Sequence, residues 1–298
     1  MVSTIRSQQR WGKLFILPAL VVYVFFLLIP LLFSFALSLF AWDGLGKLAF
    51  NGLDNFKTLI FEANFWNAVQ NNLEFAIYTI IFGNSIALFF AILLESRIGG
   101  KRVKGKDFYR FLLFSQFILS WVVVSFLWKR ILNPFDGLLN QVLKGIGLSS
   151  LSKNWLGDPS TALPSISFTA IWKGFGFGLV TYSAAIQSIS EEVMDAARID
   201  GASQWQINTK IIIPLLKPII GIIVMLQLID AFRVIDPIVI MATGTPMKSV
   251  QVIGVYIYKT AFDYYQMGYS SALSVALFFI VTVISVAYFI LQKKSSND

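Results

Sequence analysis

One polar stretch stands between two long apolar segments and reads EEVMDAARIDGASQWQINTKIIIPLLKP over residues 191–218. Its first ten residues are good helix formers, and acids precede bases in an order that the helix dipole favours. Gly201 can end or bend this helix, and Pro214 and Pro218 mark the start of the next apolar segment. The stretch therefore predicts a short amphipathic helix held between two membrane spans, on which a partner protein can push.

Six stretches of the chain are long and apolar enough to cross a bilayer, which takes about 20 residues. Of the 298 residues, 56% are hydrophobic and 13% are charged, whereas a soluble domain carries about 25% charged residues. The stretches are uniformly apolar and do not alternate, which argues against membrane-spanning strands. We therefore expect an all-α membrane protein with a single transmembrane domain over residues 1–298. Its six predicted spans are residues 14–40, 72–94, 111–132, 166–189, 211–242 and 269–291.

The positions of the basic residues predict the orientation of these spans. Short cytoplasmic loops collect Lys and Arg. The N-terminal segment, the loops after the second and fourth spans, and the C-terminal segment hold most of the 24 Lys and Arg residues. Both termini are therefore expected in the cytoplasm. We expect the first span to remain uncleaved, because its apolar run is about twice as long as the 7–15 residues of a signal-peptide core.

The residue inventory excludes several kinds of chemistry. The chain has no Cys and no His, so neither a thiolate site nor a histidine base is available, and we predict no metal site. Residues 100–107 come close to a phosphate-binding loop, but Asp107 stands where Ser or Thr should bind magnesium. We interpret this loop as a basic surface that faces anionic lipid headgroups. The net charge of +8 therefore does not indicate a nucleic-acid partner.

Ionisable residues inside a span are functional hypotheses by default. Gln227, Asp230, Arg233 and Asp236 step by three residues along the fifth predicted span and so form a slanting polar stripe. One interpretation is mutual ion pairing between residues three apart. The other is that part of the stripe lines a substrate path. Lys173 lies near the expected outer end of the fourth span, where its ammonium can reach the membrane surface.

Gly174 and Gly178 form a pair of small residues four apart within the fourth predicted span. Such a pair favours close packing of two helices. The alternative is a locally pliable helix beside a transport pathway.

The polar stretch resembles the coupling loop of ABC importer permeases, in which Glu-Ala-Ala is followed by Asp-Gly-Ala and a distal pair of prolines. Two positions depart from that pattern, because Asp195 replaces the usual Glu and Asn208 stands where the family usually has an aromatic residue. The matching positions are Asp195-Ala196-Ala197, Asp200-Gly201-Ala202, and Pro214 with Pro218. Runs that resemble the carbohydrate-importer branch lie at residues 52–59, 133–140 and 231–236, and the likeness covers roughly residues 10–290.

This resemblance implies the type I ABC importer permease architecture, with a cytoplasmic coupling loop at residues 191–213. It implies a prokaryotic plasma-membrane protein that works with a second, sister permease, two cytoplasmic ATPase subunits and an extracytoplasmic solute-binding protein. The residues expected to couple to an ATPase are Asp195, Ala196, Ala197, Asp200, Gly201 and Ala202. The chain itself is expected to be no enzyme and to hold no cofactor, because ATP and magnesium belong to the ATPase subunits.

The resemblance also implies a sugar or an oligosaccharide as the transported solute. The candidates for a substrate path, chosen as aromatic faces and hydrogen-bonding groups, are Trp121, Trp172, Tyr182, Gln227, Asp230 and Arg233. Arg233 leaves open an anionic solute, such as a sugar phosphate or an acidic saccharide. Two other functional classes fit the sequence less well. An ion-coupled secondary transporter needs an ionisable relay and usually internal repeats, and an intramembrane enzyme is disfavoured by the lack of His and Cys.

Overall fold

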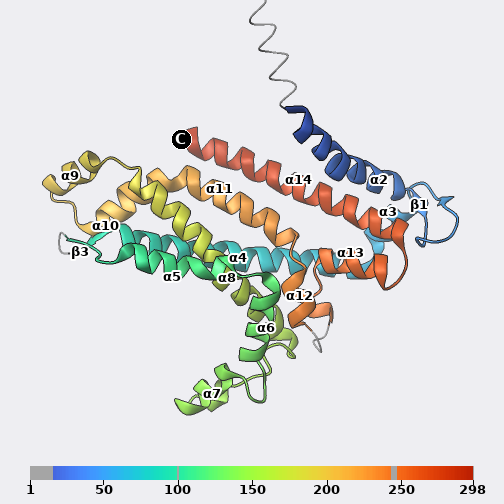
Figure 1. Cartoon of the computed structure of the whole chain (residues 1–298), viewed down its shortest axis with the longest axis horizontal. Helices are drawn as coiled ribbons and strands as arrows, with labels where there is room; N and C mark the ends of the chain where they lie inside the picture. The colour runs from blue at the N-terminus through green and yellow to red at the C-terminus, as the bar shows by residue number, and fades with distance from the viewer. Residues whose placement is uncertain (1–15, 99–100, 243–246, 298) are drawn as a thin grey trace, which may run out of the picture. The chain divides into compact units, whose positions relative to one another are not determined.

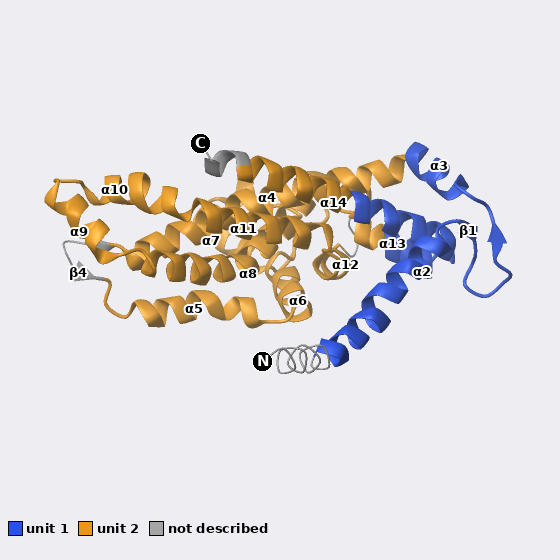
Figure 2. Cartoon of the chain, turned by 90° about the horizontal axis from the view of Figure 1, so that it is seen from above, with its two compact units in different colours: residues 1–62, 257–279 blue, residues 63–256, 280–298 orange. Residues whose placement is uncertain are grey.

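A computed structural model describes residues 16–98, 101–242 and 247–297, and most of these residues are helical (Figure 1). The chain divides into two compact units (Figure 2). Unit 1 contains the described residues up to Glu62 together with residues 257–279, and unit 2 contains residues 63–256 and those from 280 onward.

Unit 1 combines a long apolar helix with a small hairpin. The helical run Ile16–Leu37 includes a π-helical turn, η1. In the loop of the hairpin, the carboxylate of Asp43 accepts the backbone N–H groups of Gly46 at 2.7 Å and Leu45 at 3.0 Å, which lowers the pKa of Asp43. The elements that begin in this unit are η1 (Val24–Leu28), α2 (Ile29–Leu37), β1 (Phe40–Ala41), β2 (Ala49–Phe50), α3 (Asp54–Phe61) and α14 (Met267–Asn297), and strands β1 and β2 are antiparallel.

Unit 2 is a helical bundle around α8. More than half of the 29 residues of α8 are buried, and α8 packs against α4, α5 and α11. The elements of this unit are α4 (Ala63–Glu95), β3 (Arg97–Ile98), β4 (Lys101–Arg102), α5 (Lys106–Ile118), α6 (Trp121–Ile131), α7 (Leu138–Gly145), η2 (Ser149–Leu151), α8 (Pro159–Gln187), α9 (Glu191–Ile199), α10 (Gln204–Ile207), η3 (Asn208–Ile212), α11 (Ile213–Phe232), α12 (Asp236–Met241), η4 (Met247–Ser249) and the first part of α13 (Ile253–Phe262).

Within the described part of the chain, four helical runs are long and apolar enough to cross a membrane, and the bent pair α5 and α6 makes a fifth if it is one span. The four runs are Ile16–Leu37, Ala63–Glu95, Gln204–Phe232 and Met267–Lys293. They lie at the first, second, fifth and sixth predicted spans, although the first two residues of the span predicted at 14–40 fall outside the described residues. The fourth predicted span is helical as α8 but is less apolar. Its polar side chains are buried among neighbouring helices, where lipid does not select against them.

The third predicted span, residues 111–132, is not one straight helix. α5 ends at Ile118, α6 begins at Trp121, and their axes differ by 97° (Figure 1). The residues between them are extended, and the hydroxyl of Ser120 accepts the backbone N–H of Val123 at 3.3 Å as an N-cap. The sequence does not locate this break, because Ser115, Ser120 and Ser125 all have the chemistry of a cap.

The fifth predicted span, residues 211–242, is also interrupted. The helix runs on to Phe232, then Arg233–Ile235 leave it, and α12 starts at Asp236. Asn72 of α4 is completely buried at this break. Its Nδ2 donates to the carbonyl of Ala231 at 2.9 Å, and its Oδ1 accepts the backbone N–H of Ile253 at 2.7 Å. A backbone group without a partner costs several kcal/mol in an apolar interior, so Asn72 stabilises the interrupted helix.

Replacing Asn72 by Leu removes both partners at once. We expect the free energy of unfolding to fall by roughly 2–6 kcal/mol, because each of the two buried backbone groups left without a hydrogen bond costs about 1–3 kcal/mol. Thermal unfolding of the purified protein in detergent measures this change. Gln141→Leu is the matched control, since the amide of Gln141 makes an exposed bond to the Asp136 carbonyl. Equal melting temperatures for both variants would contradict the assignment.

Candidate functional site

A cavity of about 480 Å³ lies within unit 2, among α4, α5, α8, α11 and the breaks that precede α6 and α12. Its volume is in the range of small-molecule sites, about 300–1,000 Å³. The walls combine aromatic rings with charged and amide groups, as a site for a polar solute with apolar faces requires. The aromatic members are Phe75, Phe117, Trp121, Phe175 and Phe177, and the charged and amide members are Lys173, Gln227, Asp230, Arg233 and Asp236.

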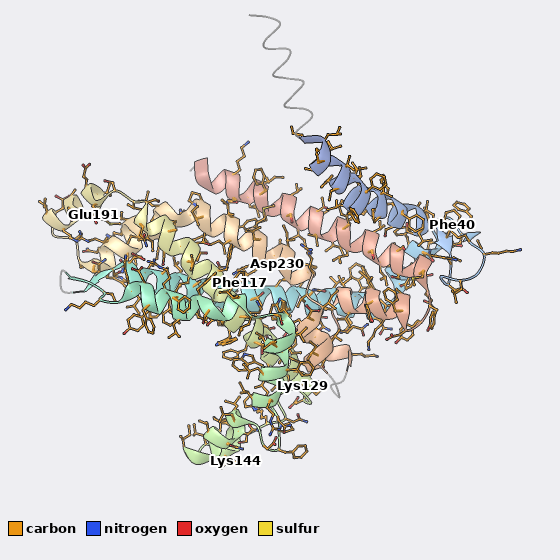
Figure 3. All side chains as sticks on the ribbon, in the orientation of Figure 1. Phe40, Phe117, Lys129, Lys144, Glu191 and Asp230 are labelled. Atoms are coloured by element: carbon orange, nitrogen blue, oxygen red, sulfur yellow. The ribbon has the colours of Figure 1, made fainter. Side chains whose placement is uncertain are left out.

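Four of the six predicted substrate-path residues line this cavity, namely Trp121, Gln227, Asp230 and Arg233. The other two lie elsewhere in unit 2. The ring of Trp172 packs edge-on against Trp128, with 5.6 Å between centroids. Tyr182 is completely buried. Figure 3 shows Phe117 and Asp230 in the same central region of unit 2, well away from Glu191 at the start of α9.

Tyr182 nevertheless reaches the cavity wall through one intermediate residue. Its hydroxyl donates to Oδ1 of Asn84 at 2.6 Å, and Nδ2 of Asn84 donates to Oε1 of Gln227. This chain of hydrogen bonds links α8, α4 and α11. The sequence interpretation missed Asn84, although an Asn inside an apolar span is itself a signal of buried hydrogen bonding.

The polar stripe of the fifth span does not form the predicted ion pairs. Among residues 16–98, 101–242 and 247–297, no ion pair joins Asp230, Arg233 or Asp236 to another residue. The i,i+3 spacing requires a continuous helix, and α11 ends before Arg233. The three side chains line the cavity instead, which favours the other interpretation of the stripe.

Lys173 is turned into the bundle rather than toward the membrane surface, and it is 7% exposed. Its Nζ donates to the carbonyl of Phe117 at 2.9 Å and lies about 5 Å from the ring centroids of Phe117 and Trp121. The last carbonyls of a helix lack partners within the helix and favour a nearby cation. Lys173 therefore caps α5 where the helix breaks and fixes Trp121 at the start of α6.

The two glycines of α8 have different roles. A Cβ at Gly178 would lie 2.9 Å from Cβ of Ala87, so Gly178 allows α4 and α8 to approach closely. Gly174 has open space around it and lines the cavity. The predicted close packing of two helices is therefore found at Gly178, whereas Gly174 forms part of the cavity wall.

The polar stretch that follows α8 folds as two short helices joined at Gly201. The hydroxyl of Ser190 accepts the backbone N–H of Glu192 at 3.2 Å and starts α9. Gly201, at φ +79°, ends α9: its N–H donates to the Arg198 carbonyl at 3.0 Å, and the N–H of Ala202 donates to the Ala197 carbonyl at 2.9 Å. This pair of bonds is a Schellman motif. The predicted helix and its glycine stop are confirmed.

α9 stands on the surface of unit 2 and contains no buried residue. Oδ1 of Asp195 lies 2.5 Å from Nη1 of Arg198. Ile199 is 86% exposed and Trp205 on α10 is 75% exposed. Of the predicted coupling residues, Asp195, Ala196, Asp200 and Gly201 are exposed, whereas Ala197 and Ala202 are half-buried.

Comparison with known proteins places this geometry in a family. Residues 9–297 match the binding-protein-dependent transport system inner membrane components. The chain belongs to this family. The probable ABC transporter permease protein YurN of Bacillus subtilis is 35% identical to this permease over 282 residues, which cover 94% of each chain.

Two further comparisons agree with this assignment. The probable starch degradation products transport system permease protein AmyD of Thermoanaerobacterium thermosulfurigenes is 28% identical, over 95% of this permease and 94% of the relative. A chain in the crystal structure of a bacterial alginate ABC transporter, in complex with an alginate pentasaccharide-bound periplasmic protein, has a TM-score of 0.81 and 25% identity. That match covers 96% of this permease and 94% of the other chain.

The permease is therefore a multi-pass membrane protein and a transport component rather than a catalyst. Within the residues that the structure describes, no group of three or more Asp or Glu side chains is placed to hold a metal ion.

Replacing Lys173 by Met removes the cap of α5. We expect the free energy of unfolding to fall by about 1.5–3 kcal/mol, the usual contribution of a hydrogen bond to a charged group. Thermal unfolding checks this, and Lys173→Arg should recover part of the loss because Arg keeps a cationic donor. Lys144→Met, which removes an exposed cation from α7, is the control. A Lys173→Met protein as stable as the wild type would show that the cap does not hold the break.

Proposed function

We propose that this permease forms part of an ATP-driven importer that carries a sugar or oligosaccharide across the plasma membrane of a prokaryote. The observation that carries the proposal is the cavity in unit 2, in which Trp121 offers a ring face and Gln227 and Asp230 offer hydrogen-bonding groups. Aromatic faces combined with a few placed polar groups suit a saccharide. The relative named for starch degradation products supports this solute class.

The charges of the cavity leave room for a second class of solute. Two cations, Lys173 and Arg233, and two acids, Asp230 and Asp236, line the same space. Lys173 is engaged by the Phe117 carbonyl, whereas Arg233 has no ion-pair partner among the described residues. An anionic saccharide is therefore the alternative, and the similarity to a chain of an alginate transporter agrees with it.

The proposed architecture has six crossings, with the bent pair α5 and α6 as the third and α8 as the fourth. Both termini and α9 then face the cytoplasm, as the distribution of Lys and Arg predicts. The partners are a sister permease of different sequence, two ATPase subunits and an extracytoplasmic solute-binding protein. ATP and magnesium bind to the ATPase subunits. The exposed surface of α9 and α10, with Asp195 and Gly201 in it, is the proposed contact with one ATPase.

The proposed role of Trp121 is tested by truncating it in the assembled transporter. We expect Trp121→Ala to lower solute uptake into vesicles by about fivefold to tenfold, because a lost stacking face weakens binding by roughly 1–1.4 kcal/mol. Trp172→Ala is the control, since that ring packs on Trp128 outside the cavity. Uptake should be assayed with neutral and acidic oligosaccharides. Equal uptake by both variants would remove Trp121 from the substrate path.

The proposed role of α9 is tested at Gly201. A Val there is strained by about 1–3 kcal/mol at a positive φ, which disturbs the end of α9. We expect Gly201→Val to insert into the membrane normally but to lose the ATPase subunits on purification. Gly147→Val is a matched control, because Gly147 has φ +82° at the end of α7. Retention of the ATPases by Gly201→Val, with normal transport, would contradict the assignment of α9.

A further inference from the structure

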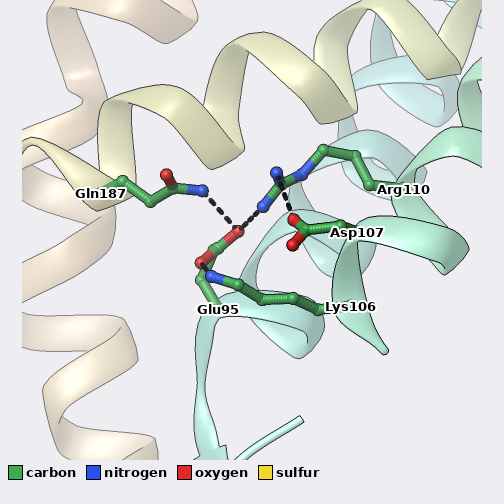
Figure 4. A network of polar contacts seen from close by, with 5 residues as sticks. All are labelled: Glu95, Lys106, Asp107, Arg110 and Gln187. Carbon is green, nitrogen blue, oxygen red and sulfur yellow. Dashed lines mark hydrogen bonds and ion pairs between the residues drawn. The ribbon is translucent and has the colours of Figure 1, made fainter. Parts of the chain in front are cut away.

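Glu95 is the last residue of α4, and its side chain is 5% exposed. Both carboxylate oxygens are used (Figure 4). Oε2 accepts from Nζ of Lys106 at 2.7 Å, and Oε1 accepts from Nε2 of Gln187 at 3.0 Å and from Nη2 of Arg110. One buried carboxylate therefore receives three donors. We call Glu95 and these three donors the Glu95 cluster.

The Glu95 cluster joins the ends of three helices. Lys106 is the first residue of α5, Arg110 lies one turn further along it, and Gln187 is the last residue of α8. Each of the three helices also contributes to the cavity wall, through Thr79 on α4, Phe117 on α5 and Lys173 on α8. The cluster thus connects the end of α4, the start of α5 and the end of α8. Other residues of the same three helices enclose the cavity.

α9 lies next to the Glu95 cluster but is not packed onto it. A cavity of about 250 Å³ separates them, with Glu95, Lys106 and Gln187 on one side and Glu191, Met194 and Arg198 of α9 on the other. α9 buries none of its residues. Three residues, Ser188, Ile189 and Ser190, join its start to α8. α9 contacts the core of unit 2 through the partly buried side chains of Met194 and Ala197, and a displacement of α9 is applied to α8 directly beside the cluster.

We propose that Glu95 is a positioning residue for transport, which holds α4, α5 and α8 together so that displacement of α9 moves all three helices. The inference rests on the proposed function, in which an ATPase displaces α9. Without the shared carboxylate, movement of α9 bends the end of α8 alone. The cavity then responds less to ATP hydrolysis, although the ATPase remains bound.

The test uses the complete transporter, with its ATPase subunits and solute-binding protein, in proteoliposomes. The measured quantity is the amount of oligosaccharide imported per ATP hydrolysed. We expect Glu95→Gln to lower this ratio by about tenfold, within the 5–150-fold range of typical coupling between sites, while the ATPase subunits still co-purify. Asp107→Asn is the matched control and should keep the ratio, because Asp107 also contacts Arg110 but is 81% exposed.

A second variant separates positioning from folding. The chain has no Cys, so Glu95→Cys combined with Gln187→Cys can be joined by a bifunctional thiol cross-linker. We expect a low ratio before cross-linking and recovery of most of it afterwards. A wild-type ratio in Glu95→Gln, an equal fall in Asp107→Asn, or failure of the double variant to recover or to assemble would each overturn the inference.

The two proposals fail in different ways. If Glu95→Gln keeps both its ATPase subunits and a normal ratio, only the role of Glu95 is wrong. If Gly201→Val keeps its ATPase subunits and transports normally, the docking role of α9 is wrong, and with it the basis of the inference.

Discussion

The structure of unit 2 depends on side chains that satisfy backbone groups at interrupted helices. In an apolar bundle, a helix can break only where its free carbonyls and N–H groups find other partners. Lys173 supplies the partner for the Phe117 carbonyl, and Asn72 supplies partners for Ala231 and Ile253. Lys129 does the same near the end of α12, where its Nζ donates to the Ile240 carbonyl at 3.0 Å.

The cavity lies at these breaks. In uninterrupted helices, Arg233 and Asp236 would keep the helical spacing that pairs charges three residues apart. The interruptions instead turn Trp121 to the cavity wall and release Arg233 and Asp236 from the helical spacing that would pair them. The features that distinguish this permease from a plain helical bundle therefore follow from where its helices stop, and from the few polar side chains that allow them to stop there.

α8 connects the cavity with the surface helix α9. Two of its buried polar residues are hydrogen-bonded to neighbouring helices, Lys173 to the Phe117 carbonyl of α5 and Tyr182 to Asn84 of α4. Its last residue, Gln187, belongs to the Glu95 cluster, and α9 begins four residues later. A helix that is surrounded by other helices, such as α8, can have polar side chains in place of apolar ones, because these polar groups form hydrogen bonds with the neighbouring helices. This explains why α8 is less apolar than the other spans.

The sequence by itself determined what depends on local chemistry. Long apolar runs, the Ser190 cap and the Gly201 stop act within a few residues of themselves, so α9 and the approximate positions of the long helices were predictable. Only the tertiary structure decided where the spans break, because the breaks depend on donors from other helices, Lys173 for α5 and Asn72 for α11. It also decided which aromatic residues line the cavity, placing Trp121 in the wall and Trp172 against Trp128. Hydropathy gives each residue a preference for burial, but whether it faces a cavity or a neighbouring helix is set by partners distant in the chain.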